Sequence, residues 1–147
     1  MMAQPVIFIF GLGFVGRALG HLMATAGWSI RGTTRDPNRF AAEMAAGWEI
    51  IPFSDQQRMP VIDRAVDGVS AIISTITAIS GSDPVLDMHA DDLAGFSGWV
   101  GYVSATSVYP DKPNGVCYEH TRPDPATSRG KARLLAEQRW QQLFDAE

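Results

Sequence analysis

Three glycines in a G-x-G-x-x-G spacing, Gly11, Gly13 and Gly16, carry the clearest chemical signal in this sequence. They directly follow an apolar run over residues 5–10 and precede a helical pattern. In that context the first glycine permits a tight turn, the second lets the backbone approach a pyrophosphate, and the third lets the helix pack closely on the strand. The helix start also offers unpaired N–H groups and the positive end of its dipole to phosphates. The pattern therefore predicts a site for the paired phosphates of a dinucleotide.

The alternative is a tight strand-to-helix turn that holds no ligand. The flanking elements have the order and length that a phosphate-binding turn requires, which favours the ligand site. Beyond the glycines, apolar residues recur at spacings of three and four, so one helix face is expected to lie against a sheet. Gly27 is expected to end this helix. The residues of the predicted inward face are Val15, Ala18, Leu19, Leu22, Met23 and Ala26.

The segment about 20 residues beyond the glycines indicates which dinucleotide is bound, because NAD-binding folds usually place an Asp or Glu there for the ribose 2′-hydroxyl. This chain has Thr33, Thr34 and Arg35 instead. A guanidinium beside two hydroxyls suits a 2′-phosphate, so NADP is favoured over NAD; a solvated surface arginine is the alternative. Asp36 argues against this, but the proline that follows it favours a helix N-cap. Asp55 is expected at the adenine edge, with a solvated loop acid equally compatible.

The rest of the chain alternates between strand and helix patterns. Five strands are predicted, at 5–10, 28–34, 48–53, 69–76 and 99–104. Helices are predicted after the glycines, after Asp36, around 61–66, over 84–93 and after a long loop at 109–125. Residues expected to face inward after Asp36 are Phe40, Ala41, Met44 and Ala45. This alternation predicts a doubly wound α/β (Rossmann) fold, with a parallel sheet and a ligand beyond the carboxyl ends of the strands.

Length and composition set limits on the function. The 147 residues, 46% of them hydrophobic, fit one domain over 1–147 with a real core. No apolar run approaches the roughly 18 to 20 residues of a membrane span, and no signal peptide is recognisable, so a cytoplasmic location is expected. A net charge of −4 with interspersed signs argues against a nucleic-acid partner. The single Cys117 and the widely separated His21, His89 and His120 predict neither a disulfide nor a metal site.

A second motif follows the fifth predicted strand. It consists of Y-V-S-A-T-S-V-Y-P over 102–110, then Glu119, Pro123 and Pro125, and R-G-K-A-R-L-L-A-E over 129–137. These segments resemble the extended short-chain dehydrogenase/reductases, the NAD-dependent epimerase/dehydratase family. Together with the glycine turn, the resemblance covers essentially the whole chain. It is closest to the atypical branch, whose members keep the cofactor fold and vary the catalytic residues.

The resemblance implies a catalytic tyrosine, a lysine four residues later that lowers the tyrosine pKa and holds the ribose, and a Ser or Thr that polarises the substrate oxygen. This chain departs at all three positions. Arg129 stands at the tyrosine, Arg133 at the lysine and Ala105 at the hydroxyl residue. Arginine stays protonated and alanine donates no hydrogen bond, so the usual mechanism is not available on this alignment.

Two hydroxyl residues could repair the site. Thr106 adjoins Ala105, and a shift of one residue would bring its hydroxyl to the substrate side. Tyr109 lies in the same turn and could donate the proton if a neighbouring arginine lowered its pKa. The alternative is that Thr106 and Ser107 cap the strand end while Tyr109 packs under the loop. Glu119 and His120 could line the substrate mouth, although a solvated loop pair fits them better.

Members of the family usually continue into a sixth strand and a smaller substrate lobe. This sequence stops before such a lobe, so the expectation is either a short or truncated version or a part of a longer gene product. A version without the lobe would have its substrate side open to water, which weakens electrostatic stabilisation there. Dimerisation could cover this side, and the sequence leaves a homodimer open.

The expected function is an NAD(P)-binding domain, with NADP favoured, that transfers hydride between the nicotinamide and a small carbonyl or hydroxyl substrate such as a nucleotide sugar. The alternative is a non-catalytic NADP(H)-sensing or scaffold domain, which the loss of the usual catalytic side chains favours. Thr106 and Tyr109 are the catalytic candidates. The residues expected to bind the cofactor are Gly11, Gly13, Phe14, Val15, Gly16, Thr34, Arg35, Asp55 and Arg133.

Overall fold

The computed structural model of the chain describes residues 3–112 and 115–144 and contains one five-stranded sheet. All paired strands are parallel, in the order β3-β2-β1-β4-β5. The predicted strands are confirmed, with ends that differ by at most two residues. Their bounds are β1 Val6–Phe10, β2 Ser29–Thr34, β3 Glu49–Pro52, β4 Ala71–Ser74 and β5 Trp99–Tyr102.

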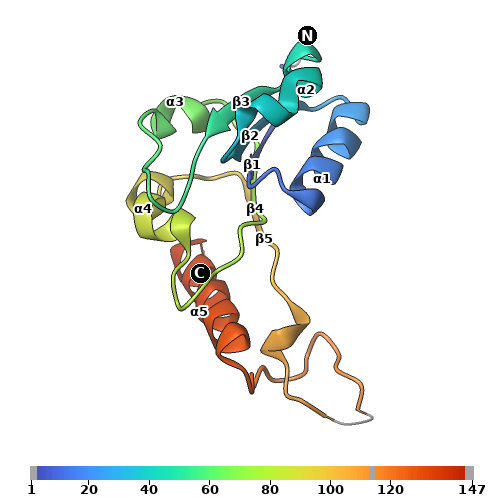
Figure 1. Ribbon diagram of the computed structural model, residues 1–147, viewed down its shortest axis with the longest axis vertical. Helices are drawn as coiled ribbons and strands as arrows, with labels where there is room; N and C mark the ends of the chain where they lie inside the picture. The colour runs from blue at the N-terminus through green and yellow to red at the C-terminus, as the bar shows by residue number, and fades with distance from the viewer. Residues whose placement is uncertain (1–2, 113–114, 145–147) are drawn as a thin grey trace.

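Helices cover both faces of the sheet (Figure 1). One face carries α1 (Phe14–Thr25) and a short helical segment that follows β2, made of the 3-10 turn η1 (Pro37–Phe40) and α2 (Ala41–Ala45). The other face carries α3 (Ile62–Val66), α4 (Pro84–Leu93) and the long α5 (Ser128–Phe144). A second 3-10 turn, η2 (Thr106–Val108), follows β5. The predicted doubly wound α/β fold is confirmed.

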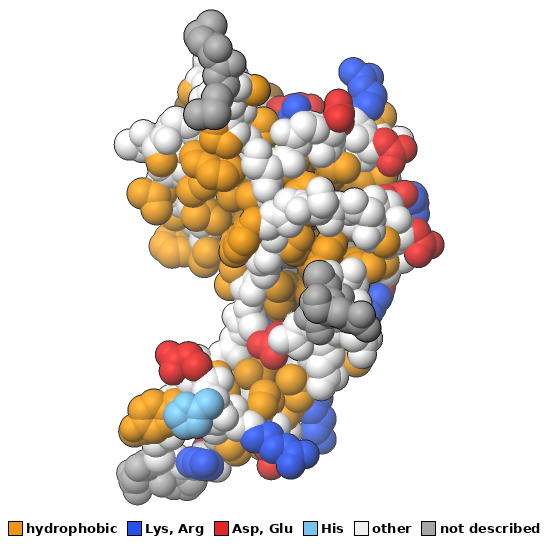
Figure 2. Space-filling view, turned by 180° about the vertical axis from the view of Figure 1, so that it is seen from behind, with side chains coloured by type: hydrophobic (Ala, Val, Ile, Leu, Met, Phe, Trp, Pro, Cys, Tyr) orange, Lys and Arg blue, Asp and Glu red, His pale blue; other side chains and the backbone are white. Residues whose placement is uncertain are grey.

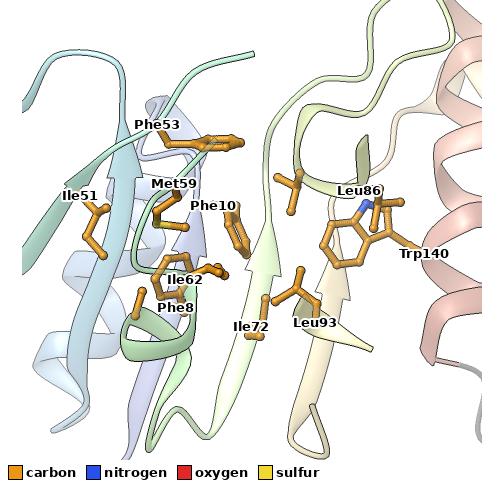
Figure 3. Packing of buried hydrophobic residues seen from close by; sticks show 12 residues of the cluster. Phe8, Phe10, Ile51, Phe53, Met59, Ile62, Ile72, Leu86, Leu93 and Trp140 are labelled. Carbon is orange, nitrogen blue, oxygen red and sulfur yellow. The ribbon is translucent and has the colours of Figure 1, made fainter. Parts of the chain in front are cut away.

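Alternating side chains of β1 supply the centres of two cores. Phe8 and Phe10 pack with 4.6 Å between ring centroids, on the face that α3, α4 and α5 cover (Figure 3). Ile7 and Ile9 point to the opposite face, toward α1 and Phe40. Burial of β1 on both faces is expected for a central parallel strand and explains its unbroken apolar sequence. The central strand therefore fixes the position of the glycine turn that directly follows it.

The predicted inward face of α1 is only partly correct. Leu19 and Met23 are half-buried, but the fully buried positions are Gly16 and Gly20. A Cβ on Gly20 would lie 2.5 Å from the Trp48 ring, so the helix packs through its glycines. The larger apolar side chains are turned outward, and hydrophobic groups gather on this side of the molecule (Figure 2). The predicted inward residues that are exposed are Val15, Ala18, Leu22 and Ala26.

Of the four residues predicted to face inward after Asp36, only Phe40 is buried. Asp36 does cap the helical segment, since its side chain accepts from Asn38 N, but the first turn is a 3-10 turn. The buried residue that follows Phe40 is Glu43, three positions later in α2. Ala41, Met44 and Ala45 are exposed.

Two further observations concern the chain as a whole. Within residues 3–112 and 115–144, no helix combines the length and apolar composition that crossing a membrane requires. Residues 113 and 114 of the predicted 109–125 loop lie outside the described residues.

Candidate functional site

A cavity of about 630 Å³ lies at the carboxyl ends of the strands. Its walls are the β1–α1 turn, the segment from Thr33 through Phe40, the residues after β3 and the loop after β4. This is the position that the predicted parallel sheet assigns to a ligand. Its volume is in the range of cavities that hold cofactors.

The glycine turn is held rigidly by hydrogen bonds to the neighbouring strands. Gly11 N donates to Thr33 Oγ1 at 2.8 Å, and Leu12 N donates to Thr33 O at 2.7 Å. The Thr75 hydroxyl donates to Gly11 O at 2.6 Å. Gly11 has a φ of +92°, and a Cβ on Gly16 would lie 2.1 Å from Gly11 O. The turn therefore requires glycine at both positions, for conformation at the first and for close packing at the second.

The start of α1 is left free to bind an anion. Gly13 is the N-cap, no side chain caps the helix, and the first turn contains no acidic residue. Gly13 lines the cavity, and a Cβ there would meet no described atom within 4 Å. The unpaired N–H groups of a helix start attract phosphate oxygens. The backbone here thus fits a phosphate group.

Two arginines line the side of the cavity beyond β2. Arg35 and Arg39 are exposed, and neither guanidinium makes a hydrogen bond or ion pair with a described residue. The neighbouring carboxylate is partly engaged, because Asp36 Oδ1 accepts from Asn38 N at 3.1 Å. Sequence analysis missed Arg39. The helix cap at Asp36 could have indicated Arg39, because a helical turn that begins at Pro37 returns residue 39 to the end of β2.

An ion pair with a buried carboxylate supports the wall behind Phe40. Glu43 is 2% exposed, and its Oε1 accepts from Arg17 Nε at 2.5 Å and contacts His21 Nε2 at 3.0 Å. The Arg17 guanidinium also lies 4.9 Å from the centroid of the Phe40 ring. The hydrogen bond from Arg17 lowers the Glu43 pKa, against an opposing effect of burial. This cluster joins α1 to α2, and no motif in the sequence indicated it.

The structure brings together part of the predicted cofactor set. Gly11 and Gly13, with Thr34, Arg35 and Asp55, all line the 630 Å³ cavity. The other glycine-turn residues, Phe14, Val15 and Gly16, form the first turn of α1 and do not line it. The Phe14 side chain is 94% exposed.

The residues of the second motif lie elsewhere. Thr106 is exposed on η2, and Tyr109 lines a separate cavity of about 550 Å³ beside β5. Arg133 is 8% exposed and donates from one terminal nitrogen to Val103 O at 3.1 Å. Arg129 is exposed at the start of α5. None of these four residues lines the cavity at the glycine turn.

Several buried polar atoms near β5 make no hydrogen bond to described residues. Burial raises the pKa of Tyr102 to about 12, so its phenol stays neutral at ordinary pH. Sequence analysis did not identify this group as a cluster, because its members come from β4, β5, η2 and α5. The atoms are the hydroxyls of Ser74, Tyr102, Ser104 and Ser107 and Nε of Arg133.

No protein-family model matches this sequence, and no curated protein matches it. Solved structures do match this chain. A functionally unknown conserved protein from Silicibacter pomeroyi DSS is 33% identical with a TM-score of 0.81, over 96% of this chain and 49% of its own.

Two further structures carry a bound dinucleotide. A short-chain dehydrogenase/reductase superfamily protein from Agrobacterium tumefaciens with bound NAD is 25% identical, with a TM-score of 0.66, over 92% of this chain and 44% of its own. A UDP-glucuronic acid 4-epimerase from Bacillus cereus in complex with UDP-glucuronic acid and NAD is 13% identical, with a TM-score of 0.73. The match covers 94% of this chain and 52% of the epimerase chain. This chain therefore spans about half the length of these structures. It has the Rossmann fold that they share, as the resemblance of its sequence implied.

Proposed function

We propose that this chain, which has the Rossmann fold of short-chain dehydrogenase/reductase and epimerase structures, binds a nicotinamide dinucleotide in the cavity at the glycine turn. One observation carries the proposal. The uncapped start of α1 adjoins a cavity of cofactor size at the carboxyl ends of the strands. The bound NAD named for two of the similar structures supports the same class of ligand.

In this proposal the pyrophosphate lies against the first turn of α1. The amides of Gly11 and Leu12 are already bonded to Thr33, so the donors left for the phosphates are those at Gly13 and beyond. This assigns Phe14, Val15 and Gly16 a role through their backbone N–H groups, which is compatible with the exposed side chain of Phe14.

We propose further that NADP is preferred over NAD. Arg35 and Arg39 supply two guanidinium groups on the β2 side of the cavity, where an adenosine 2′-phosphate would be recognised. Thr34 and Asp55 line the same cavity and complete the proposed contacts to the adenosine half. Bidentate charge-assisted bonds to a phosphate are strong, and Asp36 and Asp55 are the carboxylates in the lining of this cavity.

Calorimetric titration of the purified chain with NADPH and NADH tests both parts of the proposal. We expect NADPH to bind about tenfold more tightly, because two arginines face the extra phosphate. Arg35→Asp should reverse the order. The matched control is Arg64→Asp on α3, which changes the same charge at an exposed residue outside the cavity. Equal affinities in all three proteins would refute the NADP preference, and no heat with either nucleotide would refute the cofactor.

The proposed activity is hydride transfer between the nicotinamide and a small carbonyl or hydroxyl substrate, such as a nucleotide sugar. The bound cofactor would supply the hydride chemistry. Thr106 and Tyr109 remain the proposed hydroxyl donors, and Arg133 the proposed donor to the ribose or phosphate. An enzyme would consume NADPH with a panel of carbonyl compounds, and Tyr109→Phe would abolish that consumption.

The second candidate is a non-catalytic NADP(H)-sensing or scaffold domain. The specific observation in its favour is that Thr106, Tyr109 and Arg133 do not line the glycine-turn cavity. Tight NADPH binding without turnover would support it. The cytoplasmic location, the single domain over 1–147 and a homodimer stay predictions from the sequence.

A further inference from the structure

A short segment after β3 carries part of the wall of the cavity at the glycine turn. Phe53, Ser54 and Asp55 line that cavity. The start of the segment is fixed to the sheet, because Phe53 N donates to Thr34 O at 3.0 Å. The hydrogen bond from Gln57 N to Ser54 O is local and long, at 3.4 Å. The position of Asp55 in the wall therefore depends on where the far end of the segment is held.

A histidine of α4 holds that far end. Met59 N donates to His89 Nε2 at 3.1 Å, and the two residues are 1% and 0% exposed. The His89 ring also packs on the Phe53 ring, with 5.8 Å between centroids. His89 itself does not line the cavity. It therefore supports the wall from behind, at both ends of the segment.

The hydrogen bonds of His89 determine which ring nitrogen carries the hydrogen. Nε2 accepts from the Met59 amide, so the hydrogen of the neutral imidazole must lie on Nδ1. Nδ1 then donates to Asp92 Oδ2 at 2.9 Å, three residues later on α4. The Arg58 guanidinium donates to the same carboxylate oxygen at 2.5 Å. Asp92 thus orients the ring so that its acceptor nitrogen faces the segment.

Burial distinguishes this bond from the second contact between the segment and α4. Arg58 donates to Met88 O and to Asp92, but its side chain is 58% exposed, and exposed ion pairs contribute little to stability. The Met59 N–H is buried, so the loss of its acceptor would leave it unsatisfied. We therefore expect the segment to move when His89 loses its acceptor nitrogen. These contacts involve neither β5 nor α5.

We propose that His89, oriented by Asp92, is a positioning residue of the dinucleotide cavity. It holds the segment after β3 so that Phe53 and Asp55 keep their places in the wall that meets the adenosine half of the cofactor. The role toward the cofactor rests on the proposed function, whereas the anchoring of residues 53–59 can be tested without a ligand.

Amide hydrogen exchange and calorimetric titration with NADPH, both on the full chain, test this proposal. His89→Leu keeps a buried apolar side chain but removes the acceptor. We expect the Met59 amide to exchange at least about tenfold faster and NADPH affinity to fall about tenfold. His89→Gln offers an amide oxygen to the same N–H and should restore most of both. The ring 15N chemical shifts of the wild type should show the His89 hydrogen on Nδ1.

Trp140→Phe is the matched control for a general loss of stability. It removes another buried hydrogen bond to α4, since Trp140 Nε1 donates at 2.9 Å to Asp83 at the start of that helix. We expect it to leave the Met59 exchange and NADPH affinity unchanged. If this control lost NADPH affinity as His89→Leu does, the effect would be one of general destabilisation and the proposal would be wrong.

Further results would overturn one part or the other. Unchanged Met59 exchange in His89→Leu would exclude the anchoring. Faster exchange with unchanged NADPH affinity would exclude the role toward the cofactor. Failure of His89→Gln to restore either quantity would exclude the hydrogen bond as the cause. If the wild type bound neither NADPH nor NADH, the proposed function would fail together with the role toward the cofactor, and Met59 exchange would still decide the anchoring.

Discussion

Two cavities of the described chain differ in charge and in construction. The cavity at the glycine turn is lined by a free helix start and by Arg35 and Arg39, so it favours anions. The cavity beside β5 is lined by stacked aromatic rings and by Glu119 and Glu137, so it favours cations. The first is built mainly from short loops after neighbouring strands, and the second depends on how α5 lies against β5. One sheet thus carries two cavities whose charged lining residues differ in sign.

The largest expected effect is on the first cavity. Gly13→Asp places a carboxylate at the helix start, where the proposed pyrophosphate would lie. We expect NADPH affinity to fall at least about 100-fold, or roughly 2.7 kcal/mol, because two anions would compete for the same N–H groups. Calorimetry measures the loss.

The same variant separates binding from folding. The backbone of Gly13 is extended (φ −77°, ψ −156°), and a Cβ there meets no described atom within 4 Å, so aspartate fits without strain. Aspartate is a favourable N-cap, so the free energy of unfolding should stay equal or rise by about 0.5 kcal/mol. Gly13→Ser, which caps without a charge, should weaken NADPH binding less. Full NADPH affinity in Gly13→Asp would contradict the phosphate site.

The first cavity was predictable because its signals are local. Gly11, Gly13 and Gly16 lie within six residues, and the strand before them and the helix after them are recognisable from hydropathy alone. Arg35 followed from its position at the end of the second strand. Arg39 was missed because its place depends on a 3-10 turn, and the sequence pattern suggested an α-helical stripe instead.

The second cavity could not be predicted in the same way. Its lining comes from residues 100 to 144, and these meet only after α5 has packed on β5. The motif there did include Tyr109 and Glu119, but the sequence made Tyr109 a candidate proton donor and left Glu119 between a substrate mouth and a solvated loop. The ion pair between Arg17 and the buried Glu43 was not predicted either, because its two residues lie on different helices and a glutamate beside alanines is usually solvated.

The cores on the two faces of the sheet each contain one buried tryptophan, Trp140 and Trp48, and replacing each by phenylalanine compares how the two cores are stabilised. Trp140 Nε1 donates at 2.9 Å to Asp83, which is 1% exposed and also caps α4. Trp140→Phe leaves that carboxylate oxygen buried without its donor, so we expect a loss of about 2 kcal/mol in the free energy of unfolding. Trp48→Phe on the opposite face should cost about 1 kcal/mol, because the Trp48 indole makes no hydrogen bond to a described residue and loses only packing.

Urea unfolding followed by circular dichroism measures both variants. Equal losses would mean that the bond to Asp83 adds nothing beyond packing. Trp140 does not line the cavity at the glycine turn, so Trp140→Phe should leave NADPH affinity unchanged.

The smallest expected effect concerns acid stability on the α1 side. The hydrogen bond from Arg17 lowers the pKa of Glu43 in the folded chain below its ordinary value, despite the opposing effect of burial. A carboxyl group with a lowered folded pKa stabilises the fold above its unfolded pKa, and this contribution is lost as the pH falls through the folded pKa. The stability advantage of the wild type over Glu43→Gln should therefore be complete near pH 7 and shrink below about pH 5.

Urea unfolding at a series of pH values measures this difference. Arg17→Gln removes the main cause of the shift, so its stability should depend less on pH over the same range than that of the wild type. NADPH affinity at pH 7 should change little in Glu43→Gln, because Glu43 lies behind Phe40 and does not line the cavity. Parallel stability curves for the wild type and Glu43→Gln down to pH 3 would show that the ion pair does not stabilise this wall. The rigidity of the anion site would then rest on the glycine turn, on its hydrogen bonds to Thr33 and on the bond from Thr75.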